Sequence, residues 1–274
     1  MPVVCETNHC PEAEQFFPGC KRTPLSIRWC DELGGQGKLW VAEANGFYWV
    51  YDGKEHIAAT TPRRIYRFLY RTLANRLAYL KHSYLPKGIV PPLAGATAIN
   101  FGANIGEVAI LLAKRGMQVF AVEPDPYLLP ALHANAKRFG FVVVPVAVWN
   151  ENGPLQLYLK TDSADSSVFN VSDKAIIVKA RTIDSIVSAF DLKHVGLIIG
   201  DAEGAEPEAL EGAKQTLKIT DYVSVRASAE RNGESTQPAC EAILCEAGFD
   251  IIYKEKDKFC TLIGRNRSTM SFAV

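Results

Sequence analysis

The stretch of sequence that decides the fold is Thr97-Ala98-Ile99-Asn100-Phe101-Gly102-Ala103-Asn104-Ile105-Gly106-Glu107. An apolar run rich in β-formers leads into two glycines, and apolar residues at helical spacing follow in residues 108–112. This pattern predicts a strand, a tight turn and a helix. Because such a turn brings backbone N–H groups and a helix N-terminus close to a ligand, the stretch predicts a ligand-binding turn.

A second apolar run, residues 118–122, ends at Glu123. A carboxylate at this distance from a glycine turn can accept hydrogen bonds from two ribose hydroxyls. The turn and the carboxylate together predict a nucleoside-binding βαβ unit.

The composition is that of an ordinary globular protein of 274 residues, with 48% hydrophobic and 22% charged residues. The formal net charge is zero, so we expect no general attraction to nucleic acid or to anionic membranes. No apolar run is long enough to predict a membrane span, and residues 1–6 lack the basic and apolar segments of a secretion signal. The seven cysteines lack CxxC spacing, which suits reduced thiols. We therefore expect a cytoplasmic protein.

Residues 1–92 are predicted to form an extension that precedes a main domain at residues 93–274. Scattered cysteines in residues 1–37 could bind zinc, but the missing paired spacing favours free thiols. Residues 38–52 predict an aromatic β-hairpin with Asn45-Gly46 at its turn, and residues 63–85 predict an amphipathic helix with a basic face. Hairpin and helix together suggest a lid, although the hairpin's aromatic residues more commonly pack on a core.

The main domain alternates predicted strands and helices. Strands are expected at residues 97–101, 118–122, 141–148, 155–159, 175–180, 195–199 and 222–225, helices at 125–139, 183–190, 206–217 and 239–247, and a closing hairpin at 250–263. Such alternation predicts an α/β fold with a mostly parallel sheet covered by helices on both faces. Functional groups should gather at the carboxyl ends of the strands, where Gly102, Glu123, Asp201 and the loop after Val225 all fall.

Four separated motifs resemble the FkbM family of S-adenosylmethionine-dependent methyltransferases. They are Asn100 to Glu107, Val122-Glu123-Pro124-Asp125-Pro126, Thr182-Ile183-Asp184 and Asp201-Ala202-Glu203-Gly204-Ala205-Glu206, and the match runs from about Thr97 to Gly264. The resemblance implies the seven-stranded, Rossmann-like sheet of class I methyltransferases. It also implies O-methylation of a hydroxyl on a saccharide or on a small natural-product-like metabolite.

The resemblance implies that S-adenosylmethionine is the cofactor. The turn from Phe101 to Gly106 would approach its methionine part, Glu123 would hold the ribose, and Pro124 and Asp125 would flank the adenine. The full set of expected cofactor-binding residues is Asn100, Phe101, Gly102, Ala103, Asn104, Gly106, Glu107, Glu123, Pro124, Asp125, Ala147 and Asp201. An NAD-dependent oxidoreductase is the alternative, but the turn lacks the three-glycine spacing that cradles a pyrophosphate.

Asp201, Glu203 and Arg226 are the expected catalytic residues. Methyl transfer to an alcohol needs a positioned hydroxyl and a general base, and Asp201 at its strand end is the first candidate for the base. Asp201, Glu203 and Glu206 could also hold a divalent cation, although the first turn of a helix equally explains Glu206.

Three positions depart from the family pattern. Asn100 stands where an Asp is usual, Ile199 where a Lys is common, and Arg226 where a Glu often closes the strand. The charge of Arg226 suggests either an acidic or phosphorylated acceptor, or a protein that has lost catalysis and binds the nucleoside alone. The sequence thus predicts a small-molecule or saccharide acceptor and no nucleic-acid partner; it is compatible with a homo-oligomer.

Overall fold

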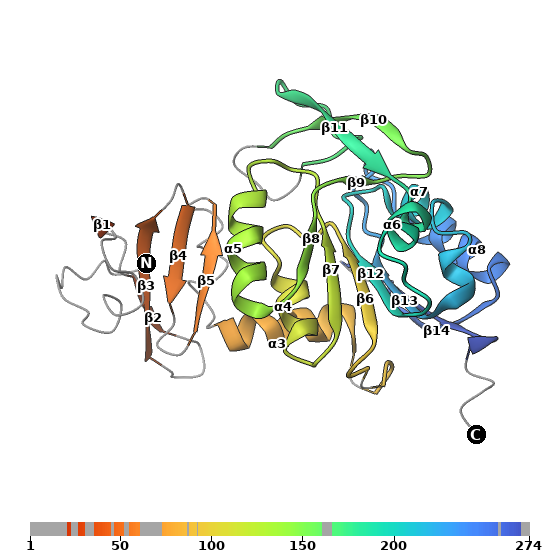
Figure 1. The fold of residues 1–274 in the computed structure, drawn as a ribbon, viewed down its shortest axis with the longest axis horizontal. Helices are drawn as coiled ribbons and strands as arrows, with labels where there is room; N and C mark the ends of the chain where they lie inside the picture. Colours follow the sequence, from red (N-terminus) through yellow and green to blue (C-terminus); the bar gives the residue numbers. More distant parts are fainter. Residues whose placement is uncertain are drawn as a thin grey trace.

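A seven-stranded sheet forms the centre of the computed structural model. The structure describes residues 55–60, 73–86, 88–91, 93–160, 166–256 and 259–269, together with the strands at 21–22, 27–30, 36–44 and 47–51. The strands of the seven-stranded sheet follow the order β14-β15-β13-β12-β6-β7-β8 (Figure 1). Their bounds are β6 Thr97–Phe101, β7 Gln118–Val122, β8 Val142–Val144, β12 Val195–Gly200, β13 Thr220–Arg226, β14 Phe249–Lys254 and β15 Thr261–Asn266. The ladders from β13 through β12, β6 and β7 to β8 are parallel, and β15 is antiparallel to both of its neighbours.

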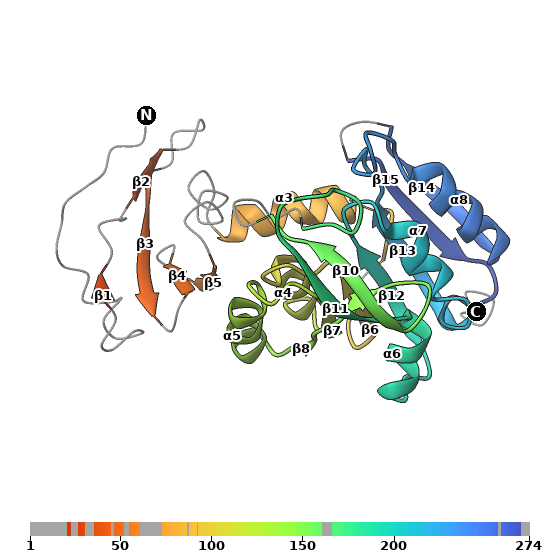
Figure 2. The same ribbon diagram turned by 90° about the horizontal axis from the view of Figure 1, so that it is seen from above.

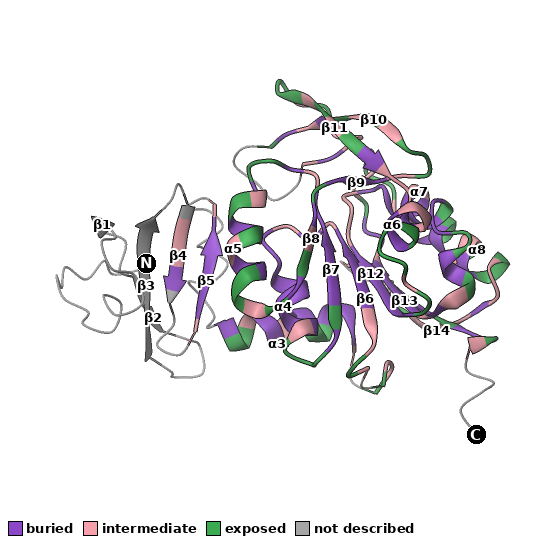
Figure 3. Ribbon diagram, in the orientation of Figure 1, coloured by how far each residue is buried: buried purple, intermediate pink, exposed green. Residues whose placement is uncertain are grey.

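Helices cover both faces of this sheet, as alternating side chains on the strands require. Ala98 on β6 joins the hydrophobic cluster of helices α3, α4 and α5, whereas the next residue, Ile99, joins that of α6, α7 and α8. Buried residues run along the central strands between the two layers (Figure 3). The helices are α3 Leu73–Tyr84, α4 Glu107–Ala113, α5 Leu129–Phe139, α6 Ile183–Ala189, α7 Glu206–Glu211 and α8 Gln237–Glu246, with a 3₁₀ helix at Thr216–Ile219. The α/β class and the seven-stranded, mostly parallel sheet are therefore confirmed.

The strand order reverses between β6 and β12. Strands β7 and β8 continue to one side of β6, and β13 lies on the other side of β12. In open α/β sheets, ligands bind in the crevice at the carboxyl ends of the two strands that flank such a reversal. The turn after Phe101 and the loop after Gly200 stand at this point.

A smaller sheet, β10-β11-β9, lies beyond the carboxyl ends of the main strands (Figure 1). Its strands are β9 Ala147–Val148, β10 Gly153–Tyr158 and β11 Ala175–Arg181. Residues 141–148 were expected to form one strand, but β8 ends at Val144, and Ala147 pairs instead with Ala180 of β11. Pro145 between them has no N–H to continue the first ladder, which accounts for the break.

The helix expected at residues 206–217 is also divided, because α7 ends at Glu211. A Cβ atom at Gly212 would lie 2.2 Å from the carbonyl oxygen of Trp149, so the chain passes too close to another backbone for a side chain here. The 3₁₀ helix at Thr216–Ile219 then leads into β13.

The amino-terminal strands form a separate antiparallel sheet beside α5 (Figures 1 and 2). They are β1 Lys21–Arg22, β2 Ile27–Cys30, β3 Gln36–Ala44, β4 Phe47–Tyr51 and β5 His56–Ala59. The expected hairpin is confirmed by the pairing of β3 with β4, whose register places Ala44 opposite Phe47. Of the basic helix expected at 63–85, α3 supplies residues 73–84, and residues 61–72 lie outside the described ranges, as do Cys5, Cys10 and Cys20.

Asn135 of α5 joins the amino-terminal sheet to the main domain. Its side chain is fully buried, accepts a hydrogen bond from the N–H of Ala58 at 2.7 Å, and donates to the carbonyls of Ala58 at 3.0 Å and Ile105 at 2.7 Å. Ile57, Ala58 and Ala59 also belong to the hydrophobic cluster of α3, α4 and α5. The described part of residues 1–92 thus shares a core with residues 93–274. Within the described ranges, no helix has the length and apolar character needed to cross a lipid bilayer.

Candidate active site

Gly102 brings two strand ends into backbone contact. Its φ is +62°, and a Cβ atom there would lie 1.8 Å from the carbonyl oxygen of Asp201. The Asp201 N–H in turn donates to the carbonyl of Phe101 over 3.4 Å. Only a residue without a side chain allows the turn after β6 to lie this close to the loop after β12.

The second glycine of the motif serves packing. Gly106 precedes α4 with φ +93°, and a Cβ atom would approach the side chains of Phe141 and Leu132 to 2.8 and 2.9 Å. Its lack of a side chain therefore lets the turn pack closely beside α5 and the start of the next strand segment.

Glu123 ties the glycine turn to the end of β7. One carboxylate oxygen accepts the N–H of Asn104 at 2.7 Å, and the other accepts the N–H of Asp125 at 3.0 Å. Asn104 has φ +57°, a conformation that Asn adopts more readily than most residues. These bonds hold the carboxylate at a fixed place in the wall of the crevice.

The strand ends surround a cavity of about 530 Å³. Most of the expected site residues line it, namely Gly102, Ala103, Asn104, Glu107, Glu123, Pro124, Ala147, Asp201, Glu203 and Arg226. Helix α3 contributes Arg76, Leu80 and Tyr84 to the same wall, and the segment after β10 contributes Lys160, Ser166 and Asn170.

Five expected residues stand behind the cavity wall: Asn100, Phe101, Gly106, Asp125 and Glu206. Phe101 is fully buried against Gly200. Asp125 accepts the hydroxyl of Ser166 at 2.9 Å and so connects the β7 end to the segment after β10. Asn100 is 2% exposed, and its Oδ1 finds no hydrogen-bond partner among the described residues.

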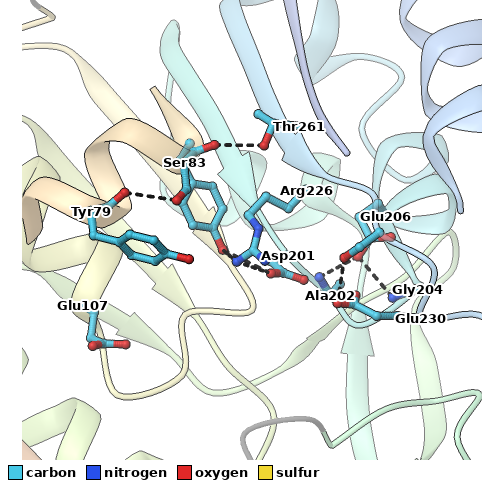
Figure 4. A network of polar contacts seen from close by, with 12 residues as sticks. Tyr79, Ser83, Glu107, Asp201, Ala202, Gly204, Glu206, Arg226, Glu230 and Thr261 are labelled. Carbon is cyan, nitrogen blue, oxygen red and sulfur yellow. Dashed lines mark hydrogen bonds and ion pairs between the residues drawn. The ribbon is translucent and has the colours of Figure 1, made fainter. Parts of the chain in front are cut away.

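Asp201, Arg226 and Tyr84 form a connected polar group. Figure 4 shows Asp201 and Arg226 side by side at its centre. Oδ2 of Asp201 lies 3.1 Å from a guanidinium nitrogen of Arg226 and accepts the hydroxyl of Tyr84 over 3.2 Å. The guanidinium also lies over the ring of Phe259, 4.3 Å from its centroid. Burial and then the charge of Asp201 raise the pKa of Tyr84 well above 10, so its phenol stays protonated. The positive charge that the sequence places at 226 is thus paired inside the site.

Helix α3 is fastened at both ends to the domain that it covers. Arg76 makes a two-bond ion pair with Glu107 of α4, at 2.8 and 3.1 Å, and both side chains are largely buried. At the other end, the hydroxyl of Ser224 donates to the carbonyl of Tyr84 at 2.5 Å, and Thr261 donates to that of Ser83 at 2.8 Å. The residue expected to contact cofactor, Glu107, therefore also holds one wall of the cavity in place.

Three carboxylates meet beside this group, since oxygens of Asp201, Glu206 and Glu230 lie within 4.8 Å of one another. Glu206 is fully buried and accepts hydrogen bonds from the N–H groups of Ala202 and Gly204 and from the hydroxyl of Thr236, at 2.7, 3.2 and 2.7 Å. Burial, followed by the charge of Asp201, raises the pKa of Glu206 to about 7.

This group differs from the cation-binding trio expected from the sequence, which had Glu203 in place of Glu230. Glu203 lines the cavity, but the described carboxylates at metal-ligand spacing are those of Asp201, Glu206 and Glu230. A guanidinium already lies beside Asp201, where it offsets the negative charge that would attract a cation.

Sequence reasoning missed Arg76, Tyr84 and Glu230 as site residues. Arg76 was seen as part of a basic helical face, with no sign of its partner 31 residues away. Glu230 falls in the polar loop after β13, and the rule that ligands bind at strand ends could have singled it out.

An α/β sheet with a cavity at its strand reversal, lined by a glycine turn and strand-end carboxylates, defines a ligand-binding protein of the Rossmann-like class. Residues 100–251 match the family model described as a methyltransferase FkbM domain, which spans more than half of the chain. The chain belongs to this family. It is also 24% identical to the 2-O-methyltransferase NoeI of Sinorhizobium fredii (strain NBRC 101917 / NGR234) over 175 residues, 56% of this chain and 72% of the relative.

Among solved structures, the fibrillarin pre-rRNA processing protein of Methanococcus jannaschii matches with a TM-score of 0.44 and 14% identity, covering 91% of this chain and 98% of that one. The magnesium protoporphyrin IX methyltransferase ChlM of Synechocystis PCC 6803 matches with a TM-score of 0.42 and 11% identity, covering 71% and 78%. At these scores neither likeness bears on the activity of this chain.

Proposed function

We propose that this chain is an S-adenosylmethionine-dependent O-methyltransferase whose acceptor is a hydroxyl of a saccharide or a small natural-product-like metabolite. Membership in the FkbM methyltransferase family supports methyl transfer, and the name of the relative NoeI, a 2-O-methyltransferase, favours oxygen as the acceptor atom. The observation that most supports the proposal is the close approach of Gly102 to Asp201, because the glycine turn and the strand-end carboxylate then line one cavity.

The donor end of the cavity is assigned to Glu123 and the glycine turn. A carboxylate has about four lone-pair positions, so Glu123 can accept ribose hydroxyls in addition to its two backbone donors. Asn100 stands behind the glycine turn, so we assign the amino-acid tail of the cofactor to the turn residues that line the cavity, Gly102, Ala103 and Asn104. The donor set therefore fits a nucleoside with an amino-acid tail, and it needs no pyrophosphate cradle.

The acceptor end is assigned to the space beside Asp201, Glu203 and Arg226. Arg226 was expected to attract an acidic or phosphorylated acceptor, but its guanidinium is paired with Asp201 and stacked on Phe259. Carboxylates and hydroxyl-bearing residues nearby suit an uncharged, polyhydroxylated acceptor better than an anion. S-adenosylmethionine, when bound, supplies the methyl group as an electrophile, and the residues around the acceptor position its hydroxyl and receive its proton.

Two measurements test the proposal. Calorimetry should show saturable binding of S-adenosylmethionine and S-adenosylhomocysteine, whereas binding of NAD in their place would refute it. Incubation with methyl-labelled cofactor and a panel of neutral sugars, sugar phosphates and small hydroxylated metabolites should label neutral acceptors. Saturable cofactor binding without transfer to any acceptor would favour the alternative of a nucleoside-binding protein that has lost catalysis.

Glu123→Gln tests the assignment of the ribose site. Losing a charge-assisted hydrogen bond costs roughly 1.5–3 kcal/mol, so the Kd for S-adenosylhomocysteine should rise about 10- to 100-fold. Glu151→Gln on the exposed turn before β10 is the matched control and should leave the Kd unchanged. Equal affinities of the two variants would reject the role of Glu123.

A further inference from the structure

Glu230 is held firmly at the acceptor side of the cavity, although the sequence assigned it no role. It lies in the loop after β13 and lines the cavity together with Asp201 (Figure 4). Its backbone carbonyl accepts the side-chain amide of Asn170 at 3.1 Å. The following residue, Arg231, donates to the carbonyl of Gly204 at 2.9 Å and stacks on the ring of Phe169 at 3.9 Å. Contacts from two other loops therefore hold the backbone that carries Glu230 in place.

One oxygen of the Glu230 carboxylate accepts a hydrogen bond, and the other accepts none from the described residues. The hydroxyl of Ser228 donates to Oε1 at 2.7 Å, and the shielded Oε2 has no hydrogen-bond partner among the described residues. The charged groups that face it are Asp201, Glu206 and Arg226. Burial, and then the negative charge of Asp201, raises the pKa of Glu230 to about 7. A general base works best when its pKa lies near the working pH.

The two other carboxylates of the cluster are less suited to receive a proton from an acceptor. Oδ2 of Asp201 already accepts Tyr84 and pairs with Arg226, and these positive and donor contacts stabilise its ionised form. Glu206 is fully buried, receives three hydrogen bonds and stands behind the cavity wall. Glu230 also lines the cavity, and none of the described ion pairs joins it to a guanidinium, so its ionised form lacks the stabilisation that Arg226 gives to Asp201.

We propose that Glu230 accepts the proton of the acceptor hydroxyl, and that Asp201, held by Arg226 and Tyr84, is a positioning residue beside it. The inference rests on the proposed O-methyl transfer. As the acceptor oxygen bonds to the methyl carbon, the carbon–sulfur electron pair passes to the sulfur of the donor. The hydroxyl proton passes to Glu230, which releases it to solvent before the next turnover.

Glu230→Gln tests the proposal because it keeps the shape of the side chain and removes its basicity. We expect kcat to fall about 100-fold or more, the usual range for loss of a general base, while the Kd for S-adenosylhomocysteine stays within about twofold. The wild-type rate should rise with pH around an apparent pKa near 7, and this limb should be absent from the variant. Glu234→Gln, an exposed change on the same loop, should behave as wild type.

Carbon-13 NMR of labelled carboxyl groups, without cofactor, gives a readout that does not depend on activity. Two resonances should titrate near pH 7 in the wild type, those of Glu206 and Glu230. Glu230→Gln should remove one of them and keep the other, and in Asp201→Asn the Glu230 resonance should titrate at lower pH because a neighbouring negative charge is lost. Wild-type kcat and pH profile in Glu230→Gln, or an ordinary Glu titration, would overturn the role of Glu230 alone. Absence of cofactor binding and methyl transfer in the wild type would instead overturn the proposed function.

Discussion

The hydroxyl of Tyr84 donates a hydrogen bond to Oδ2 of Asp201 over 3.2 Å, so the last residue of α3 reaches the end of β12 across 117 positions of sequence. Tyr84→Phe removes this bond and the one that Arg226 donates to the same hydroxyl. Because both partners remain buried, we expect a loss of about 1–3 kcal/mol in the free energy of unfolding, measured by urea denaturation.

Tyr127→Phe is the control for this change, since Tyr127 is 62% exposed. Its effect should stay within about 0.5 kcal/mol. If the two variants were equally stable, Tyr84 would contribute packing alone.

Gly102→Ala should abolish cofactor binding. Its Cβ would overlap the carbonyl oxygen of Asp201, so the two strand ends must separate. Gly140→Ala controls for backbone strain, because Gly140 also has positive φ, at +78°, but no atom within 4 Å of a new Cβ. That control should cost about 1–2 kcal/mol and keep the affinity for S-adenosylhomocysteine. Equal affinities by calorimetry would contradict the close approach at Gly102.

The ion pair of Arg76 with Glu107 should matter far more than an exposed pair. Arg76→Met removes the guanidinium that faces the buried carboxylate of Glu107, which costs about 3–5 kcal/mol in unfolding free energy. Adding Glu107→Gln should recover part of this loss. Lys114 and Glu55 form the comparison pair, with 38% and 33% of their side chains exposed, and Lys114→Met should cost at most about 1 kcal/mol. Similar losses in denaturation of the two single variants would argue against α3 being anchored at Arg76.

His56 should make the protein less stable in acid. Burial, with help from Arg138, lowers its pKa from 6.5 to about 4, so the folded state holds the neutral imidazole while the unfolded state takes up a proton. The stabilising contribution is complete above pH 6.5 and is lost as the pH falls toward 4. Glu206 has a pKa raised to about 7, so it stabilises the folded state increasingly as the pH falls from 7 toward 4.5, opposite to the effect of His56.

The comparison of wild type with His56→Gln at each pH isolates the histidine from these other groups. The difference in unfolding free energy should shrink between pH 6.5 and 4. A difference independent of pH would show that the imidazole titrates normally in the folded protein.

The sequence predicted those parts of the site that follow from local patterns. Gly102, Glu123 and Asp201 each end a strand in a motif of a few residues, and parallel pairing then brings them to one edge. The same local reasoning failed where the end of an element depends on a contact with residues far away in the sequence. Nothing near Gly212 indicates that the carbonyl of Trp149 will end α7 there.

Polar contacts between side chains far apart in the sequence could not be predicted either. Asn135 looks like a surface residue of an amphipathic helix until Ala58, 77 positions earlier, is folded against it. Arg226 looked like a free charge because its partner Asp201 belongs to the neighbouring strand. In both cases the physical cause is that a buried polar group must be satisfied, and its partner is set by tertiary packing.

The break at Pro145 separates the main sheet from the smaller sheet β10-β11-β9. The chain leaves the main sheet at Val144 and forms the smaller sheet β10-β11-β9 between Ala147 and Arg181. This segment reaches the cavity through Ala147 and Leu157 of the smaller sheet and through Lys160 after β10. None of the strands in this smaller sheet pairs with β6 or β7, so changes in it need not disturb the β6–β7 ladder that precedes the glycine turn. Three side chains of this segment also reach across the cavity, because Ser166, Ser167 and Asn170 donate hydrogen bonds to Asp125, Glu203 and Glu230. Its sequence can therefore vary freely only away from these three positions.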